Sequence, residues 1–146
     1  MKYLVHTQIE IDAPPAMVWD LLVDLDNYHR WNPFIVEARG RIAPEARLWV
    51  SPQLTERRRQ TFEPIVTSYV EGVEFAWTGT ILHPLFAKGE HIFRLTELSP
   101  GRVRLVHDEV FSGIGGGIAG LVAGKITERG FDAMNRALKE QVEAKA

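Results

Sequence analysis

Two histidines and one glutamate fall on one face of the two segments expected to form the last β-hairpin of the chain. The residues Ser99-Pro100-Gly101 are a turn signal between those segments. A turn centred on Pro100 places His91 opposite Glu109 and Phe93 opposite His107. Because side chains alternate along a strand, these four share one face with three apolar residues, namely Leu95, Leu105 and Phe111.

The residue types on this face are those of acid–base chemistry. A carboxyl group that faces an apolar interior has a raised pKa, and a neighbouring histidine lowers that pKa again. Such a pair can act as general acid and general base near neutral pH. We therefore predict His107, Glu109 and His91 as candidate catalytic residues.

Other interpretations of the same residues stay open. The His107–Glu109 pair can be a structural hydrogen bond, or it can contact a bound ligand without catalysing a reaction. Two histidines and one carboxylate can also form a facial triad for a non-haem metal ion. The second histidine usual on the same strand is missing, so we expect no metal site and no cofactor.

Large aromatic residues at three further positions are candidates for the wall of a pocket. Phe75 and Trp77 share one strand face with Gly79, which leaves space beside the indole ring. Trp31 lies in the loop after two short predicted helices, and Asn32 before a proline is typical of a turn. Either tryptophan can instead pack in the core, where Trp31 would close the open end of the sheet.

Glycines crowd the start of the last predicted helix. Gly113, Gly117, Gly120 and Gly124 repeat so that one helix face is bare. A bare face either lets the helix backbone approach the sheet closely or leaves room for a ligand beneath a loosened, lid-like helix. We favour the ligand, because each glycine costs the helix roughly 1 kcal/mol relative to alanine. A phosphate-binding loop is excluded, since its first glycine and its final Ser or Thr are missing.

The residues expected to contact a ligand come from the sheet, from the loop near its open end and from the last helix. They are Trp31, Phe75, Trp77, His91, Phe93, His107, Glu109, Phe111, Gly120, Leu121, Gly124 and Phe131.

The rest of the chain must form the elements that position these residues. Apolar and polar residues alternate from Tyr3 to Ile11, which predicts a strand with one buried face. Two short helical segments follow, and the first begins at Pro14-Pro15, which suits a first helical turn. Turn signals then separate six strand candidates: Phe34–Arg41, Arg47–Pro52, Arg58–Val70, Glu74–Leu82, Gly89–Leu98 and Val103–Phe111. A long helix is expected after them, over Ile114–Glu143. The order predicts an α+β fold in which a curved, seven-stranded antiparallel sheet grips the C-terminal helix, with two short helices after the first strand.

Composition limits the class of protein. The 146 residues suit one domain spanning 1–146, and 45% hydrophobic residues suffice for a core and a cavity. A net charge of -2 argues against a nucleic-acid binder, and the lack of cysteine excludes disulfides and thiolate sites. The first ten residues lack the apolar core of a signal peptide, and no apolar run is long enough for stable membrane insertion. We therefore expect a cytoplasmic protein.

Four segments resemble the SRPBCC superfamily, which comprises START, birch-pollen-allergen-like and polyketide cyclase/dehydrase-like proteins. They are Ile9–Trp19, the run Asp24–Pro33, Gly89–Leu95 and Leu105–Gly113. The resemblance covers essentially the whole chain. It implies a helix-grip fold with a deep hydrophobic pocket. Members of the superfamily bind lipids, sterols, polyketides or plant metabolites, and some of them catalyse reactions.

Taken together, the sequence predicts binding of a small hydrophobic molecule, which is lipid-, polyketide- or isoprenoid-like, in a cavity between the sheet and the C-terminal helix. One alternative is a cofactor-independent cyclase or dehydratase that uses His107 and Glu109 as acid–base groups. Another is a cochaperone-like module that binds protein. A homodimer stays open as an assembly.

Overall fold

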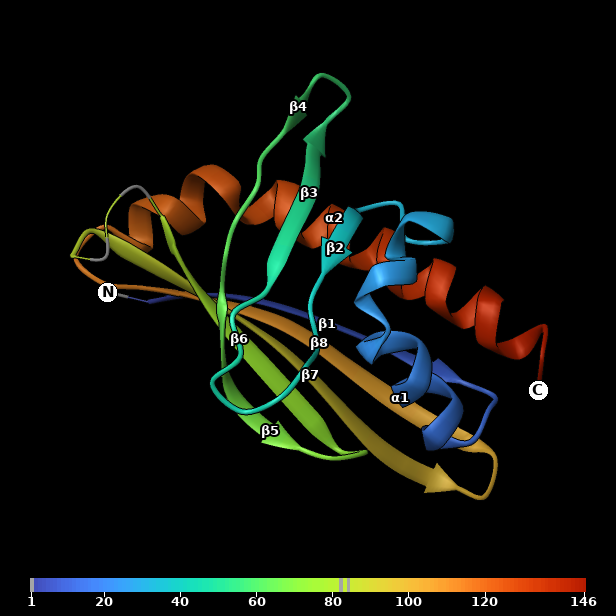
Figure 1. The fold of residues 1–146 in the computed structure, drawn as a ribbon. Coiled ribbons are helices and arrows are strands. Elements are labelled where there is room, and N and C mark those ends of the chain that lie inside the picture. Colours follow the sequence, from blue (N-terminus) through green and yellow to red (C-terminus); the bar gives the residue numbers. More distant parts are fainter. Residues whose placement is uncertain (1, 82, 84) are drawn as a thin grey trace.

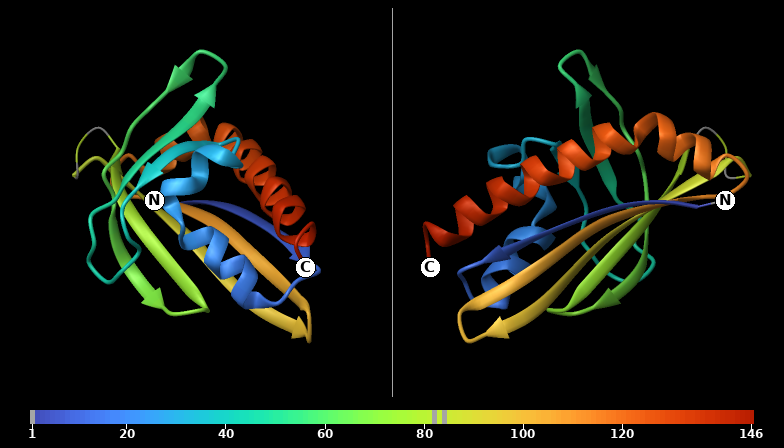
Figure 2. Two further views of the ribbon diagram at one scale, coloured as in Figure 1. Left: turned by 45° about the vertical axis from the view of Figure 1, so that its right-hand side comes forward. Right: turned by 180° about the vertical axis from the view of Figure 1, so that it is seen from behind.

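The computed structural model describes residues 2–81, 83 and 85–146 and has the predicted α+β architecture. A strongly curved antiparallel sheet wraps around one long helix, and the short helices close one side (Figures 1 and 2). In chain order the elements are β1 (Tyr3–Ile11), α1 (Pro15–Val23), the 3-10 helix η1 (Leu25–Arg30), β2 (Ile35–Arg39), β3 (Trp49–Thr55), β4 (Arg58–Arg59), β5 (Ile65–Val70), β6 (Glu74–Ile81), β7 (Ala87–Ser99), β8 (Arg102–Ser112) and α2 (Gly116–Glu143). Leu82 and Pro84, which belong to the predicted strand end and turn, lie outside the described residues.

The strands form two sheets that are joined at their border. Five strands pair in the order β1-β8-β7-β6-β5, and three pair in the order β2-β3-β4. One isolated bridge pairs Arg47, just before β3, with Ile65 of β5, and another pairs Val50 of β3 with Phe62, in the stretch between β4 and β5. The predicted single strand over 58–70 is divided into β4 and β5, because Pro64 has no N–H to donate within a ladder. The described part of the chain therefore has eight strands where the sequence predicts seven.

The last hairpin has the predicted register. His91 pairs with Glu109, Phe93 with His107 and Leu95 with Leu105. The first strand completes the other side of β8, where Thr7 pairs with His107. The alternation of side chains therefore directs both histidines and Glu109 to the concave face that α2 covers.

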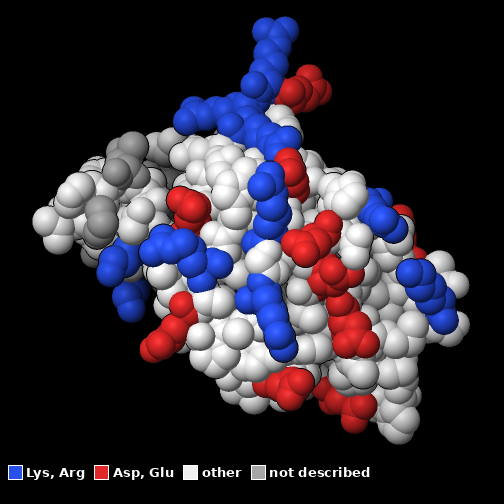
Figure 3. Space-filling model, viewed as in Figure 1, with Lys and Arg blue, Asp and Glu red and all other residues white. Residues whose placement is uncertain are grey.

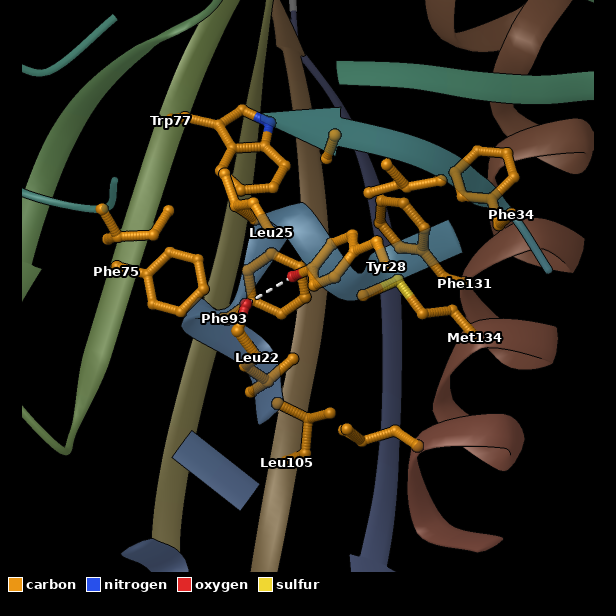
Figure 4. Packing of buried hydrophobic residues seen from close by; sticks show 14 of the residues in the cluster. Leu22, Leu25, Tyr28, Phe34, Phe75, Trp77, Phe93, Leu105, Phe131 and Met134 are labelled. Atoms are coloured by element: carbon orange, nitrogen blue, oxygen red, sulfur yellow. Dashed lines mark hydrogen bonds between the residues drawn. The ribbon is translucent and has the colours of Figure 1, made fainter. Parts of the chain in front are cut away.

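The core lies between this concave face and the three helices. Figure 4 shows Phe75 and Phe93 pointing inward from the sheet, toward Phe131 and Met134 on α2. Tyr28 on η1 is fully buried, and its hydroxyl donates to the backbone oxygen of Leu22, 2.5 Å away. Buried tyrosine hydroxyls need such a partner, so this bond fixes the short helices against the core.

The bare face of α2 packs on the first strand rather than over a ligand. A Cβ atom added at Gly120 would overlap the ring of Tyr3, and one at Gly124 would lie 2.8 Å from Tyr3 Cε1. At the start of the helix, a Cβ at Gly115 would overlap the ring of Phe86. The expectation of a ligand-covering lid at Gly120 and Gly124 is therefore wrong, because aromatic rings already fill the space that the missing side chains leave.

Replacing Gly120 by alanine should lower the free energy of unfolding by about 2 kcal/mol, which is typical of overpacking. Alanine otherwise favours a helix over glycine by roughly 1 kcal/mol, so the loss has to come from the contact with Tyr3. Urea unfolding of Gly120→Ala, Tyr3→Ala and the double variant measures this coupling. In the Tyr3→Ala background the same Gly120→Ala change should be neutral or stabilising. An equal loss in both backgrounds would contradict the packing role.

Candidate functional site

A cavity of about 180 Å³ lies between the middle of α2 and the concave face of the sheet. Trp77, His91, Glu109 and Phe111 contribute to its sheet wall, and Phe131 contributes to its helix wall. Further apolar side chains come from the segment before β2, from β3 and from the stretch between β4 and β5: Phe34, Val50, Leu54 and Phe62. The wall is therefore largely apolar, as expected of a small-molecule site.

Five predicted ligand-contacting residues line this cavity and seven do not. Trp77, His91, Glu109, Phe111 and Phe131 lie on its wall. Phe75 and Phe93 are buried in the core beside it, His107 lies behind His91, and Trp31 packs against Tyr28 with ring centroids 5.3 Å apart. Gly120 and Gly124 contact Tyr3, and Leu121 is 75% exposed on the outer face of α2. The assignment of Leu121 is wrong because the next residue of a helix turns about 100° away from the packed face.

The sequence did not point to the wall that the β3–β4 region supplies. Val50 and Leu54 line the cavity from β3 of the smaller sheet, and Phe62 lines it from the stretch between β4 and β5. The alternation of apolar residues around Val50 signals a buried strand face. Its position opposite His91 and Glu109 depends on how the curved sheet closes, which a local pattern does not encode.

The two histidines form a hydrogen-bonded chain with Asn135 and Thr7. The Nε2 atoms of His91 and His107 are 2.6 Å apart, and His107 Nδ1 is 2.7 Å from Asn135 Oδ1. Asn135 Nδ2 donates to Thr7 Oγ1 over 3.0 Å, and Thr7 Oγ1 donates to the backbone oxygen of His107 over 2.6 Å. All four side chains are buried.

The backbone oxygen at the end of this chain determines the direction of every bond in it. A carbonyl oxygen only accepts, so Thr7 donates its single hydroxyl hydrogen there and must accept from Asn135. The amide oxygen of Asn135 then faces His107, whose Nδ1 carries the hydrogen; in the neutral ring that burial favours, its Nε2 is the acceptor. His91 consequently donates from Nε2 and keeps a lone pair on Nδ1. Both rings are neutral in this arrangement.

Burial favours the same neutral state of both rings. It lowers the pKa of His107 to about 3, although the Asn135 hydrogen bond opposes the shift. Burial also lowers the pKa of His91 well below its usual value, and the nearby His107 adds to that effect. The rings stack on Phe131, with centroids 4.6 Å away for His91 and 3.8 Å for His107. His107 therefore supports His91, since both ring nitrogens of His107 form hydrogen bonds.

Glu109 pairs with His91 in the strand register, but among the described residues its carboxyl group makes no hydrogen bond with either histidine. Its Oε2 atom is buried and has no hydrogen-bond partner within the described part of the chain. Burial, together with the nearby charge of Glu90, raises the pKa of Glu109 to about 8. Gly89 lies beside the carboxyl group, and a Cβ there would be at ordinary contact distance, 3.4 Å from Oε2. At neutral pH the cavity wall therefore presents a protonated carboxyl group rather than a His–Glu ion pair.

Metal ligation has little support in this arrangement. Among residues 2–81, 83 and 85–146, no three His, Asp or Glu side chains come together in a group suited to a metal ion. His107, one of the three predicted facial ligands, uses both ring nitrogens in hydrogen bonds. In the same residues, no helix has the length and apolar character needed to cross a bilayer.

Comparison with known proteins extends this description. The family described as polyketide cyclase / dehydrase and lipid transport matches residues 3–143. Comparison with curated proteins finds no match. The chain is similar in structure to the Zhui aromatase/cyclase from Streptomyces sp. R1128, with a TM-score of 0.78, 15% identity, and 98% of this chain and 94% of that chain covered.

Two other solved structures share the same fold. A START superfamily protein from Mycobacterium smegmatis is 19% identical, with a TM-score of 0.77 and coverage of 98% of this chain and 99% of that chain. Ara h 8.0201 is 14% identical, with a TM-score of 0.74 and coverage of 99% of both chains. Identities this low establish a shared helix-grip fold and leave the chemistry to the residues of each site.

Proposed function

This chain belongs to the polyketide cyclase / dehydrase and lipid transport family, and we propose that it binds a small, largely apolar molecule between α2 and the sheet. The observation that carries the proposal is the carboxyl group of Glu109. Its Oε2 atom is buried on the wall of a largely apolar cavity and has no hydrogen-bond partner among the described residues. A buried polar atom of this kind costs about 1–3 kcal/mol unless something bonds to it, and a ligand atom supplies that bond.

The size of the cavity restricts the apolar part of the ligand. A cavity of about 150 Å³ holds a benzene molecule, and this one has about 180 Å³. It therefore accommodates a single ring with a short substituent or a slender chain. Trp77, Phe111 and Phe131 supply the contact surface for that group.

The charge state of the wall restricts the polar end of the ligand. Glu109 is protonated at neutral pH, because burial raises its pKa to about 8. A protonated carboxyl group donates one hydrogen bond. We therefore propose that the ligand has a neutral oxygen acceptor, such as the carbonyl of a ketone or an ester, opposite Glu109.

Matched probes test this proposal. Acetophenone and ethylbenzene have similar size, but only the former has a carbonyl oxygen. Isothermal titration should show that the protein prefers acetophenone by about tenfold, which is the net value of one hydrogen bond. Glu109→Leu should remove this preference while ethylbenzene still binds, and Glu97→Leu, at an exposed position on β7, should retain it. Equal affinity of the wild type for both probes would overturn the proposal.

A second candidate function follows from the raised pKa of Glu109. A carboxyl group with a pKa of about 8 can serve as general acid near neutral pH, so a proton-transfer reaction on a carbonyl substrate is chemically accessible. His107 has no free ring nitrogen for that step. Glu109→Gln distinguishes the two functions, since an enzyme would lose turnover while a binding protein would keep its affinity for ketones.

A further inference from the structure

The start of α2 exposes an unusual number of apolar side chains. Ile114, Ile118, Leu121 and Val122 are 63% to 88% exposed, and Leu85 in the loop between β6 and β7 is 76% exposed. We call these five residues the apolar tip. Scattered apolar residues on a surface are ordinary, but a contiguous exposed group marks an interaction site or an aggregation hazard.

The segments that carry the tip are fixed to one another. The backbone N–H of Gly115 donates to the oxygen of Phe86 over 2.6 Å, and the ring of Phe86 lies where a side chain of Gly115 would be. Figures 1 and 2 show the loop between β6 and β7 beside the N-terminal end of α2 in every view. The five side chains therefore form one feature at this end of the molecule.

The exposed face of α2 changes from apolar to charged along the helix, where Lys125, Glu128 and Arg129 are exposed. Ile118, Leu121 and Val122 lie at positions i, i+3 and i+4, and Lys125 follows at i+7 on the same face. Arg129, also exposed, continues that face after one further turn. An exposed apolar face that is flanked by basic residues is typical of helices that lie at a membrane surface.

The two segments that carry the tip contain only basic charges, and Glu90 and Glu128 follow directly after them. The sequence over residues 82–89 and 112–127 contains Lys88 and Lys125 and no Asp or Glu, whereas the whole chain has a net charge of -2. Lys88 pairs with Ser112 at the end of the sheet, which places it close to the start of α2. In Figure 3 this end of the molecule, on the left, is largely white, and both blue and red side chains lie next to it.

We propose that the apolar tip docks on a bilayer that contains anionic phospholipid. The five side chains enter the boundary between headgroups and acyl chains, and Lys88 and Lys125 face the lipid phosphates. Charge complementarity favours this occupant over a second copy of the chain, which has the same basic tip. Ala123 and Ile81, on the cavity wall, lie close in sequence to the tip residues. Docking therefore brings an apolar ligand in the membrane close to the cavity, although the proposal does not depend on Glu109.

Vesicle sedimentation tests the proposal directly. The wild type should sediment with phosphatidylcholine vesicles that contain phosphatidylserine, and much less with pure phosphatidylcholine or at high salt. Lys125→Gln should weaken binding by about fivefold, which corresponds to roughly 1 kcal/mol for one lysine at an anionic surface. Leu121→Asp should weaken it by about tenfold or more. Both residues are exposed, so these variants should fold normally.

Two control variants separate docking from general effects of charge and hydrophobicity. Lys145→Gln changes a lysine beyond the other end of α2, and Val73→Asp changes an exposed apolar residue in the turn between β5 and β6. Both should bind vesicles like the wild type. The proposal is overturned if the wild type ignores anionic vesicles or if the control variants lose as much binding. It is also overturned if the wild type is a dimer that Leu121→Asp dissociates and vesicles do not bind, because the tip is then an interface between two copies.

Discussion

Glu109→Gln should raise the free energy of unfolding by about 3–5 kcal/mol at pH 8 and leave it nearly unchanged at pH 4.5. The carboxyl group has a pKa of about 8 in the folded protein and a model value of 4.5. Between these values the folded state holds a proton that the unfolded state has released. Wild-type stability therefore falls as pH rises through this range, whereas glutamine has a similar shape and does not ionise.

Urea unfolding of the wild type and Glu109→Gln at both pH values measures this difference. The matched control is Glu97→Gln, because Glu97 is an exposed glutamate on the same hairpin. That variant should show the same small effect at pH 4.5 and at pH 8. If Glu109→Gln also shifts stability equally at both values, the carboxyl group ionises as easily in the folded protein as in the unfolded chain, and the argument for a protonated donor fails.

A side chain that lowers stability at neutral pH is typical of a binding or catalytic position. Structural groups are normally paired when buried, whereas functional sites contain groups whose pKa is shifted by desolvation. Glu109 has a buried oxygen with no hydrogen-bond partner among the described residues, and burial raises the pKa of its carboxyl group. Both features favour a role toward a ligand over a role in the scaffold.

The hairpin that carries this group could be predicted because its determinants are local. A turn at Pro100 and a period of two set the pairing of His91 with Glu109, and no distant residue is needed to derive it. The same local pattern directs His107 to the concave face. What it cannot predict is the partner there, since Asn135 and Thr7 come from α2 and β1.

The glycines of α2 also show the limit of prediction from a local sequence pattern. Their spacing correctly indicates a bare helix face, but the filling of that face depends on a residue at the other end of the chain. Tyr3 occupies the space opposite Gly120 and Gly124, so the helix lies close to β1 and the hollow forms further along, at Thr127 and Phe131. A sequence pattern shows where a side chain is missing, whereas the three-dimensional packing decides what takes its place.

The buried histidine pair should make the protein sensitive to acid, and Glu109→Gln should make that sensitivity visible. Both histidines have lowered pKa values in the folded state because burial opposes their charge, and the pKa of His107 is about 3. Below pH 6.5 these two histidines therefore bind protons in the unfolded chain but stay neutral in the folded protein, so the free energy of unfolding falls as pH falls. In the wild type Glu109 opposes this change down to pH 4.5, since its own effect has the other sign.

Removal of Glu109 should thus expose the full slope of the two histidines. Between pH 6 and pH 4.5 we expect the stability of the Glu109→Gln variant to fall by about 3 kcal/mol per pH unit, the slope for uptake of two protons on unfolding. His91→Leu in this background should halve the slope, whereas His29→Gln, which changes an exposed histidine, should leave it intact. Urea unfolding across this range measures the slope independently of the absolute stability of each variant. A slope that corresponds to uptake of less than one proton on unfolding would mean that the folded histidine pair itself accepts a proton. The neutral hydrogen-bonded chain from His91 through Asn135 to Thr7 would then be the wrong description of the site.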